Sequence, residues 1–368
     1  MEIFIFGAGA SHAASNKNIP LGADLCWDYA NTCCGPIFER DNYGNILSSS
    51  IEEANKLFEP FIRFLLILGN YYPYVKKEIV KIEEANKMAL QYLPPPTLAK
   101  YSGNYSDWIK EGKKYCVDEF ITKIIDSNNY DDLEGIKRFI FEHIVETSNY
   151  WGYQSNNLYE KFVDKYIYGK KPEEVKVISF NFDTLLEYSK VHSKKKTFFK
   201  YHLNETFNFI DEHGFDLSNA YTIYKLHGSV HWWCCPDCQI VHINSPFLDK
   251  DVYGSFSCDK CKTSMTPMIL APREASNKLL PRLLDKAKKE LEKARKIYII
   301  GYSLPKYDKE EFTCLCENIS ENTEITIIDV FGENESFASK YTEIKDKYSD
   351  ILKKKVNVDL GGFEKFVL

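Results

Sequence analysis

The stretch KLHGSVHWWCCPDC, residues 225–238, offers both metal ligands and a general base. Cys235 and Cys238 form one Cys-x2-Cys pair, and Cys258 and Cys261 form a second pair nineteen residues further on. Two such pairs at this spacing are typical of a four-thiolate zinc ribbon with tetrahedral coordination. Four thiolates leave no open coordination position, so the predicted zinc is structural. His227 is therefore available for chemistry at the end of a strand.

The first cysteine of the ribbon is ambiguous. Cys234 directly precedes Cys235, and two adjacent cysteines do not both ligate comfortably in one knuckle. The sequence leaves open which of the two binds the ion. We expect His231, Trp232 and Trp233 to pack at the junction between the ribbon and the neighbouring strand.

Small residues follow the apolar run at 2–6 in the order Gly7-Ala8-Gly9-Ala10-Ser11. A glycine turn after a parallel strand lets backbone N–H groups approach a pyrophosphate. The GxGxxG pattern is incomplete because His12 stands where the third glycine would be. A plain strand-to-helix turn is the alternative, and the absence of a following GKS or GKT excludes a P-loop.

Polar residues also end other apolar runs. Asn181 and Asp183 follow 175–180, Gly301 and Ser303 follow 297–300, and Asp329 follows 325–328. The alternative for Asp183 is an Asx turn that caps the next helix, and the alternative for Asp329 is a loop carboxylate or helix cap. In a parallel sheet these strand ends share one edge, so the side chains would line one ligand site.

These short apolar runs alternate with helical patterns. Besides the strands, we expect a short strand at 222–228 and helices at about 277–296 and near 308–318. Several amphipathic patterns between about 50 and 168 predict a helical insertion. The alternation predicts an α/β fold with a Rossmann-like doubly wound parallel sheet.

Composition excludes several classes of protein. The chain has 368 residues, 44% of them apolar, and a net charge of −6, so nothing directs it toward nucleic acid. No apolar stretch is long enough to cross a membrane, and the N-terminal MEIFIFGAGAS lacks the basic start of a signal peptide. Eleven cysteines, with two Cys-x2-Cys pairs, favour thiol or metal use in a reducing compartment. We therefore expect a cytoplasmic protein.

In combination and in this order, the motifs resemble the sirtuin (SIR2) superfamily. The matching residues are GAGAS with Ile19-Pro20, Asn181-x-Asp183, Lys225-Leu226-His227-Gly228, the two Cys-x2-Cys pairs and Gly301-x-Ser303-Leu304. The resemblance implies a Rossmann-like NAD-binding domain made of 1–40, 170–230 and 266–368. The remaining parts would be the helical insertion at 41–169 and a zinc ribbon at 231–265.

The resemblance also implies roles for single residues. Asn181 and His227 would be catalytic, with Asp183 lining the pocket for nicotinamide and ribose. The other NAD contacts would come from Gly7, Ala8, Gly9, Ser11, Gly301, Ser303 and Asp329. Zn²⁺ would be structural, and NAD would be the substrate.

Two departures separate the chain from the protein deacylases of this superfamily. Those enzymes have Asp-Phe-Arg after Ile-Pro, whereas here Leu21-Gly22-Ala23 follows. Their peptide-pairing strand ends in Phe-Gly-Glu, whereas here the counterpart is Leu270-Ala271-Pro272-Arg273-Glu274, and a proline removes a backbone donor. FNFDTLLE, KLHGS and IIGYSLPKYD instead look like the SIR2-like NAD-cleaving domains of bacterial anti-phage systems. That resemblance implies a homo-oligomer that depletes NAD, sometimes beside a HerA-like ATPase.

The residues suit hydrolysis of NAD to nicotinamide and ADP-ribose. Nicotinamide leaves as a neutral base, so the site needs to stabilise an oxocarbenium-like ribose and to position water. Asn181 can orient water or ribose, and His227 can act as the base. The alternatives are an NAD-dependent protein deacylase and a non-enzymatic sensor of NAD or ADP-ribose.

Overall fold

The computed structural model of the chain describes residues 1–19, 21, 67, 70–71, 117–152, 157–189, 199–201, 209–211, 220–243, 256–269, 279–330 and 336–368. It separates into two compact units. The first consists of Met1–Ile19 and Phe141–Leu368, and the second of Pro20–Ile140. The expected helices before residue 117 and the segment 270–274 lie outside the described residues, apart from isolated helical positions at 67 and 70–71.

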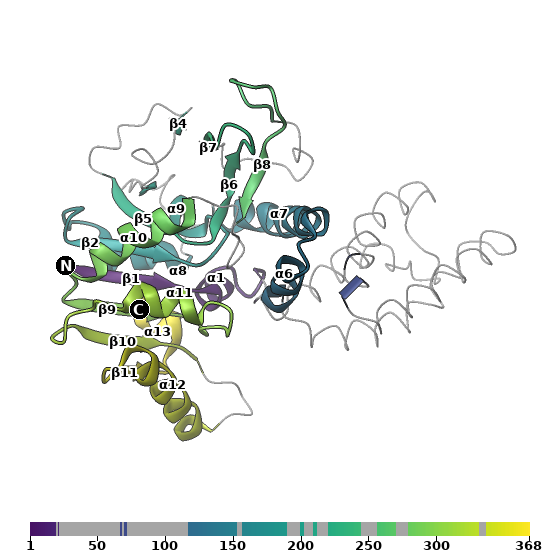
Figure 1. Ribbon diagram of the computed structural model, residues 1–368. Coiled ribbons are helices and arrows are strands. Elements are labelled where there is room, and N and C mark those ends of the chain that lie inside the picture. Colours follow the sequence, from purple (N-terminus) through teal and green to yellow (C-terminus); the bar gives the residue numbers. More distant parts are fainter. Residues whose placement is uncertain are drawn as a thin grey trace, which may run out of the picture. The chain divides into compact units, whose positions relative to one another are not determined.

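The first unit is built on a seven-stranded sheet with the order β11-β10-β9-β1-β2-β5-β3, in which every neighbouring pair is parallel (Figure 1). Its strands are β1 (Glu2–Phe6), β2 (Val175–Ser179), β3 (Phe199–Tyr201), β5 (Tyr221–Lys225), β9 (Lys296–Ile300), β10 (Glu324–Ile328) and β11 (Asn357–Asp359). Strands β2, β5 and β3 lie on one side of β1, and β9, β10 and β11, which come later in the chain, lie on the other side. The topological switch point therefore lies between β1 and β9.

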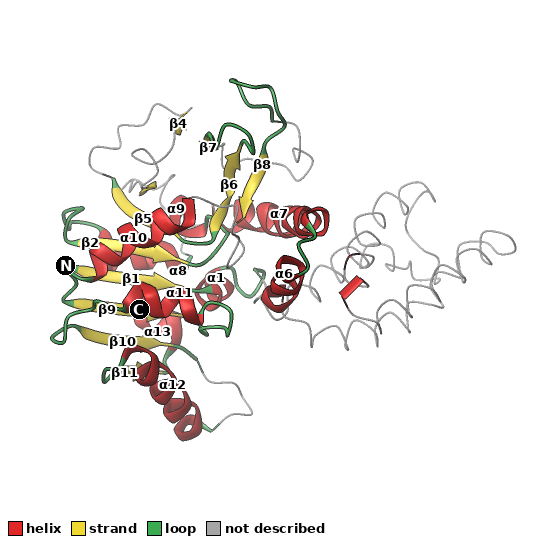
Figure 2. Cartoon of the chain, in the orientation of Figure 1, coloured by secondary structure: helices red, strands yellow, loops and turns green. Residues whose placement is uncertain are grey.

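Helices cover both faces of this sheet (Figure 2). They are α1 (Ala8–Ala14), α8 (Leu158–Phe162), the π-helical turn η1 (Val163–Ile167), α9 (Leu185–Tyr188), α10 (Leu279–Leu291), α11 (Lys309–Cys316), α12 (Phe337–Leu352) and α13 (Gly362–Val367). Ile3 and Ile5 of β1 pack with α10, α11 and α12, whereas Phe4 and Phe6 pack with α1, α8 and α13. A strand buried on both faces must be apolar at its buried positions, which explains the run IFIF after the half-buried Glu2. The predicted doubly wound sheet is confirmed.

A second sheet in the same unit has four strands in the order β4-β7-β6-β8. These are β4 (Phe209–Asp211), β6 (Gly228–Cys234), β7 (Val241–Ile243) and β8 (Thr266–Ile269). Strand β6 pairs antiparallel with both β7 and β8, and β4 pairs parallel with β7. Trp232, Val241 and Met268 join the core on one face of the large sheet, so the small sheet is packed against it.

Two further helices lie in the sequence close to residue 140, where the chain passes from the second unit to the first. They are α6 (Val117–Asp126), which lies in the second unit, and α7 (Tyr130–Gly152), which crosses the boundary. Both match amphipathic patterns of the sequence. Among the described residues, no helix is long and apolar enough to cross a membrane.

Candidate functional site

The candidate residues gather at the carboxyl edge of the large sheet. Gly7, Gly301 and Asp329 directly follow β1, β9 and β10. Asn181 and His227 lie two residues past the ends of β2 and β5. In open α/β sheets this edge, at the switch point, is where ligands bind. The topology therefore places these residues, which come from five separate segments, at one edge of the large sheet.

Asn181 is fixed by hydrogen bonds to the turn after β1, to helix α1 and to the end of β2. Its Nδ2 donates to the carbonyl oxygen of Gly7 at 3.0 Å and to Oγ of Ser11 at 2.9 Å. Its backbone N–H donates to Oγ of Ser179 at 3.1 Å. Among the described residues no donor bonds to Oδ1, so the oriented amide retains one acceptor for a water or a hydroxyl group.

Ser11 connects this amide to a tyrosine that the sequence did not single out. Oγ of Ser11 lies 3.0 Å from the phenol oxygen of Tyr159 on α8, and both residues are buried. Burial raises the pKa of Tyr159 well above its usual value, so the phenol stays protonated as a hydrogen-bonding group. The side chain of Ser11 is thus directed to Asn181 and Tyr159, and Tyr159 is a supporting residue of the site.

Gly7 and Gly9, in the turn after β1, donate hydrogen bonds to the end of β9 and to the residue that follows it. The N–H of Gly7 donates to the carbonyl of Ile300 at 3.0 Å, and that of Gly9 to Gly301 at 2.8 Å. Gly301 has a φ of +57°. These N–H groups hold the two turns together, and Ala8 begins helix α1 between them.

Asp183 lies in a buried charged network. Its Oδ1 accepts from the N–H of Leu185 at 3.1 Å, as expected for an Asx turn, although Thr184 occupies the N-cap position of α9. Nζ of Lys225 donates to the Asp183 carbonyl and to Oε1 of Glu187, the latter at 2.9 Å. Burial raises the pKa of the Asp183 carboxyl, and the Lys225 charge opposes this shift.

His227 sits at the end of β5 between aromatic rings and carboxylates. Its ring meets that of Phe180 edge-on, with 5.1 Å between centroids. Its Nε2 lies 3.6 Å from Oδ1 of Asp308 and 3.9 Å from Oε1 of Glu311. The sequence did not predict that Asp308 lies this close to His227.

Ser303 and Asp329 lie further out on this edge. Ser303 is exposed, and its carbonyl accepts from Nζ of Lys347 at 2.6 Å. Asp329 is half-buried, its Oδ1 accepts from the N–H of Val330, and its own N–H donates to the carbonyl of Asp359, the last residue of β11. No hydrogen bond links either residue to Asn181 or His227 among the described residues.

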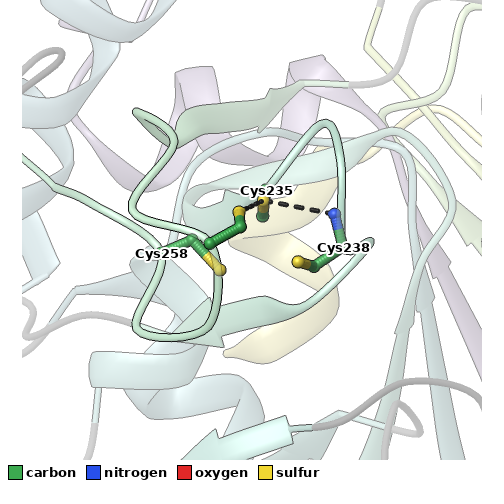
Figure 3. Close-up of side chains that lie close together, drawn as sticks. Cys235, Cys238 and Cys258 are labelled. Carbon is green, nitrogen blue, oxygen red and sulfur yellow. Dashed lines mark hydrogen bonds between the residues drawn. The ribbon is translucent and has the colours of Figure 1, made fainter.

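The four predicted zinc ligands form one cluster. The sulfur atoms of Cys235, Cys238, Cys258 and Cys261 lie within 4.8 Å of one another (Figure 3). Tetrahedral zinc with Zn–S bonds of about 2.3 Å separates its sulfurs by about 3.8 Å, so the set fits that ion. Hydrogen bonds with Thr263 lower the pKa of Cys261 to about 6, whereas the hydrogen bond with Cys261 raises the pKa of Cys238 to about 12.

The residues that precede Cys235 in the sequence make contacts outside the cysteine cluster. Cys234 lies outside it, with Sγ 3.5 Å from the carbonyl of Cys235. Nδ1 of His231 lies 3.2 Å from the hydroxyl of Tyr188. Trp232 packs edge-on against Tyr201, and Trp233 against Phe141. Of the two adjacent cysteines, Cys235 is thus the one in the cluster. His231 lies in the packed junction.

The fold and site define a class: a Rossmann-like α/β protein with polar residues at the switch point and a four-cysteine module. No protein-family model matches the chain. No curated protein matches it either.

Among solved structures, the chain is similar in fold to Sir2 homologues. One is a Sir2 homolog–NAD complex, with 14% identity, a TM-score of 0.39, and coverage of 69% of this chain and 76% of that one. Another is a Sir2–p53 peptide–NAD+ complex, with 12% identity, a TM-score of 0.37, and coverage of 100% and 90%.

Proposed function

We propose that the chain is a SIR2-like NAD glycohydrolase that cleaves NAD to nicotinamide and ADP-ribose. The observation that carries the proposal is the fixed amide of Asn181 at the switch point, on the same sheet edge as His227. This is the edge where nucleotides bind in doubly wound folds. The motif resemblance to sirtuins supports NAD as the nucleotide.

The roles follow from the donors and acceptors present. Oδ1 of Asn181 accepts from water or from a ribose hydroxyl and so orients it, while His227 removes the proton from water. The water oxygen bonds to the anomeric carbon, and the bond to nicotinamide breaks with its electron pair moving to the ring. A preorganised amide is effective here because it needs no rearrangement when charge develops.

The remaining expected contacts complete the proposal. Gly7, Ala8 and Gly9 would line the pyrophosphate as backbone without bulky side chains, and Ser11 would act through Asn181. Gly301, Ser303 and Asp329 would line the adenosine half, and Asp183 the nicotinamide and ribose pocket. Zn²⁺ would be held by the four clustered cysteines and would stabilise the small sheet that carries β6.

The test is product identification by mass after incubation of the full chain with NAD alone and with NAD plus an acetylated peptide. We expect nicotinamide and ADP-ribose with NAD alone. Asn181→Ala and His227→Ala should abolish release, whereas Asn322→Ala, exposed in a turn before β10, should retain it. Undiminished turnover in both site variants would exclude the assignment.

Other products would indicate the alternatives. Nicotinamide release that requires the peptide and yields acetylated ADP-ribose would indicate a deacylase. Tight binding of NAD or ADP-ribose without turnover would indicate a sensor.

The motif resemblance also supports a biological setting, which we include in the proposal. The protein would act in the cytoplasm as a homo-oligomer that depletes NAD in anti-phage defence, with or without a HerA-like ATPase. Cellular NAD measured after infection, with wild type and Asn181→Ala, tests this setting. Unchanged NAD with an enzyme that is active when purified would contradict the defence role and leave the chemistry intact.

A further inference from the structure

Two buried carboxylates face the imidazole of His227. Asp308 precedes helix α11 and Glu311 lies in its first turn, three residues later, so both point from one side of the helix. The side chains of His227, Asp308 and Glu311 are only 7%, 4% and 11% exposed. A carboxylate costs much free energy to bury unless it is paired or protonated, so a positive partner stabilises this arrangement.

Asp308 is held in place by its other oxygen. The hydroxyl of Tyr302 donates to Oδ2 of Asp308 at 2.8 Å. Tyr302 is itself fixed, because its ring stacks on Phe180 with 4.4 Å between centroids and its carbonyl accepts from Tyr348. Burial raises the pKa of Tyr302 well above its usual value, so the phenol remains a donor. Oδ1 is left facing Nε2 of His227.

Within the described part of the chain, aromatic rings also contact the imidazole. The rings of Phe180 and Phe182 contact it from the end of β2. Among the described residues, the carboxylates within 4.0 Å of Nε2 are those of Asp308 and Glu311. Burial raises the pKa of Glu311, and attraction to His227 opposes that shift.

We propose that Asp308, anchored by Tyr302, is a positioning residue for His227 in the NAD cleavage proposed above. It keeps a proton on Nε2, so that Nδ1 is the acceptor that takes the proton from the attacking water. Asp308 and Glu311 together stabilise the imidazolium that results. The distance of 3.6 Å exceeds a hydrogen bond, and such contacts commonly tighten once the substrate is bound.

The first test does not depend on activity. We would follow the His227 imidazole by NMR as a function of pH, with the signal assigned from its loss in His227→Ala. An opposite charge at this distance moves a titration by about 1–3 units. Asp308→Asn should therefore lower the midpoint by about 1 unit or more, and Glu311→Gln by less, because it lies further away. Glu310→Gln, the exposed neighbour, is the matched control and should leave it unchanged.

The second test is the pH profile of kcat. Removing a carboxylate that fixes the histidine tautomer can lower turnover by up to about 10⁴-fold. We expect Asp308→Asn to lower kcat at least about 100-fold with KM changed less than about threefold. The acid limb of the profile should move to lower pH, which a purely structural role would not cause. If Asp308→Asn does not fold, Glu311→Gln and Tyr302→Phe serve as the test variants.

The outcomes separate the two proposals. Shifted NMR midpoints in a protein that releases no nicotinamide would refute NAD cleavage and support the pairing of His227 with the carboxylates. Normal turnover with unchanged midpoints and unchanged kcat in Asp308→Asn would overturn the role of Asp308.

Discussion

The backbone N–H of Gly9 donates to the carbonyl oxygen of Gly301 at 2.8 Å, which joins the turn after β1 to the turn after β9. A Cβ at Gly301 would lie 2.3 Å from the backbone nitrogen of Ala10, and one at Gly7 would lie 2.5 Å from Cα of Tyr302. Both distances are too short for real atoms. Glycine is therefore required here by the packing of two backbones, whether or not a ligand binds.

Gly301→Ala should destabilise the protein strongly, because it adds a clash with backbone atoms to a left-handed φ. We expect a loss of about 2–4 kcal/mol in the free energy of unfolding, measured by urea denaturation. Gly169→Ala is the matched control: its φ is +83°, but nothing lies within 4 Å of the added Cβ. It should cost about 1–2 kcal/mol. Equal losses would show that the close approach contributes nothing.

The buried ion pair of Lys225 and Glu187 should be sensitive to removal of one partner. The two side chains are 1% and 7% exposed and lie 2.9 Å apart. Lys225→Met leaves an unpaired buried carboxylate, so we expect a loss of about 3–5 kcal/mol on urea denaturation. The double variant Lys225→Met/Glu187→Leu should lose less than the sum of the single changes. Strict additivity would mean that the pair is not coupled.

The buried carboxyl of Asp183 should make stability fall with rising pH. Because burial raises its folded-state pKa above the unfolded value of 3.8, the folded chain holds this proton more tightly. Its contribution is complete below the unfolded pKa and is lost as the pH rises through the folded pKa. The free energy of unfolding of Asp183→Asn, relative to wild type, should therefore increase as the pH rises above the unfolded pKa of 3.8.

An exposed carboxyl with the opposite shift provides the control for this pH dependence. A hydrogen bond from Lys353 lowers the pKa of Asp350, so its contribution is lost as the pH falls. Asp350→Asn should show no relative gain toward neutral pH. A relative gain in both variants would point to a general charge effect.

The cysteine cluster should bind one zinc ion per chain, measured by elemental analysis of the purified protein. Cys258→Ser removes a sulfur of the cluster and should lose both the zinc and the stability of the small sheet. Cys234→Ser lies outside the cluster and should retain the zinc. Loss of zinc in Cys234→Ser with retention in Cys235→Ser would reverse the choice between these two residues.

Much of the large sheet could be predicted because its strands are buried on both faces. The runs at 2–6, 175–180, 297–300 and 325–328 are apolar at nearly every position, and the structure places strands there. Strands β3 and β11 have three residues each, too few for a pattern. Strand β6, GSVHWWC, was not predicted, because its polar and aromatic residues are buried by tertiary contacts.

In the candidate site, too, some residues could be predicted from the sequence and others could not. Asn181, Asp183 and His227 follow strands, so their common edge could be predicted from topology. Tyr159 comes from a helix whose neighbours in space are far away in sequence, and no local pattern marks it. The spacing of Asp308 and Glu311 does carry a signal, because positions three apart share one helix face. Which residue this helix face would contact could not be predicted without the fold.

The central strand of the large sheet has consequences for synthesis of the protein. β1 pairs with β9, so β1 stays without one of its two neighbours until residues 296–300 have been translated. His227 likewise meets its carboxylates only after residue 311. A partly made chain therefore lacks the complete site, and the proposed NAD cleavage cannot begin on an unfinished polypeptide.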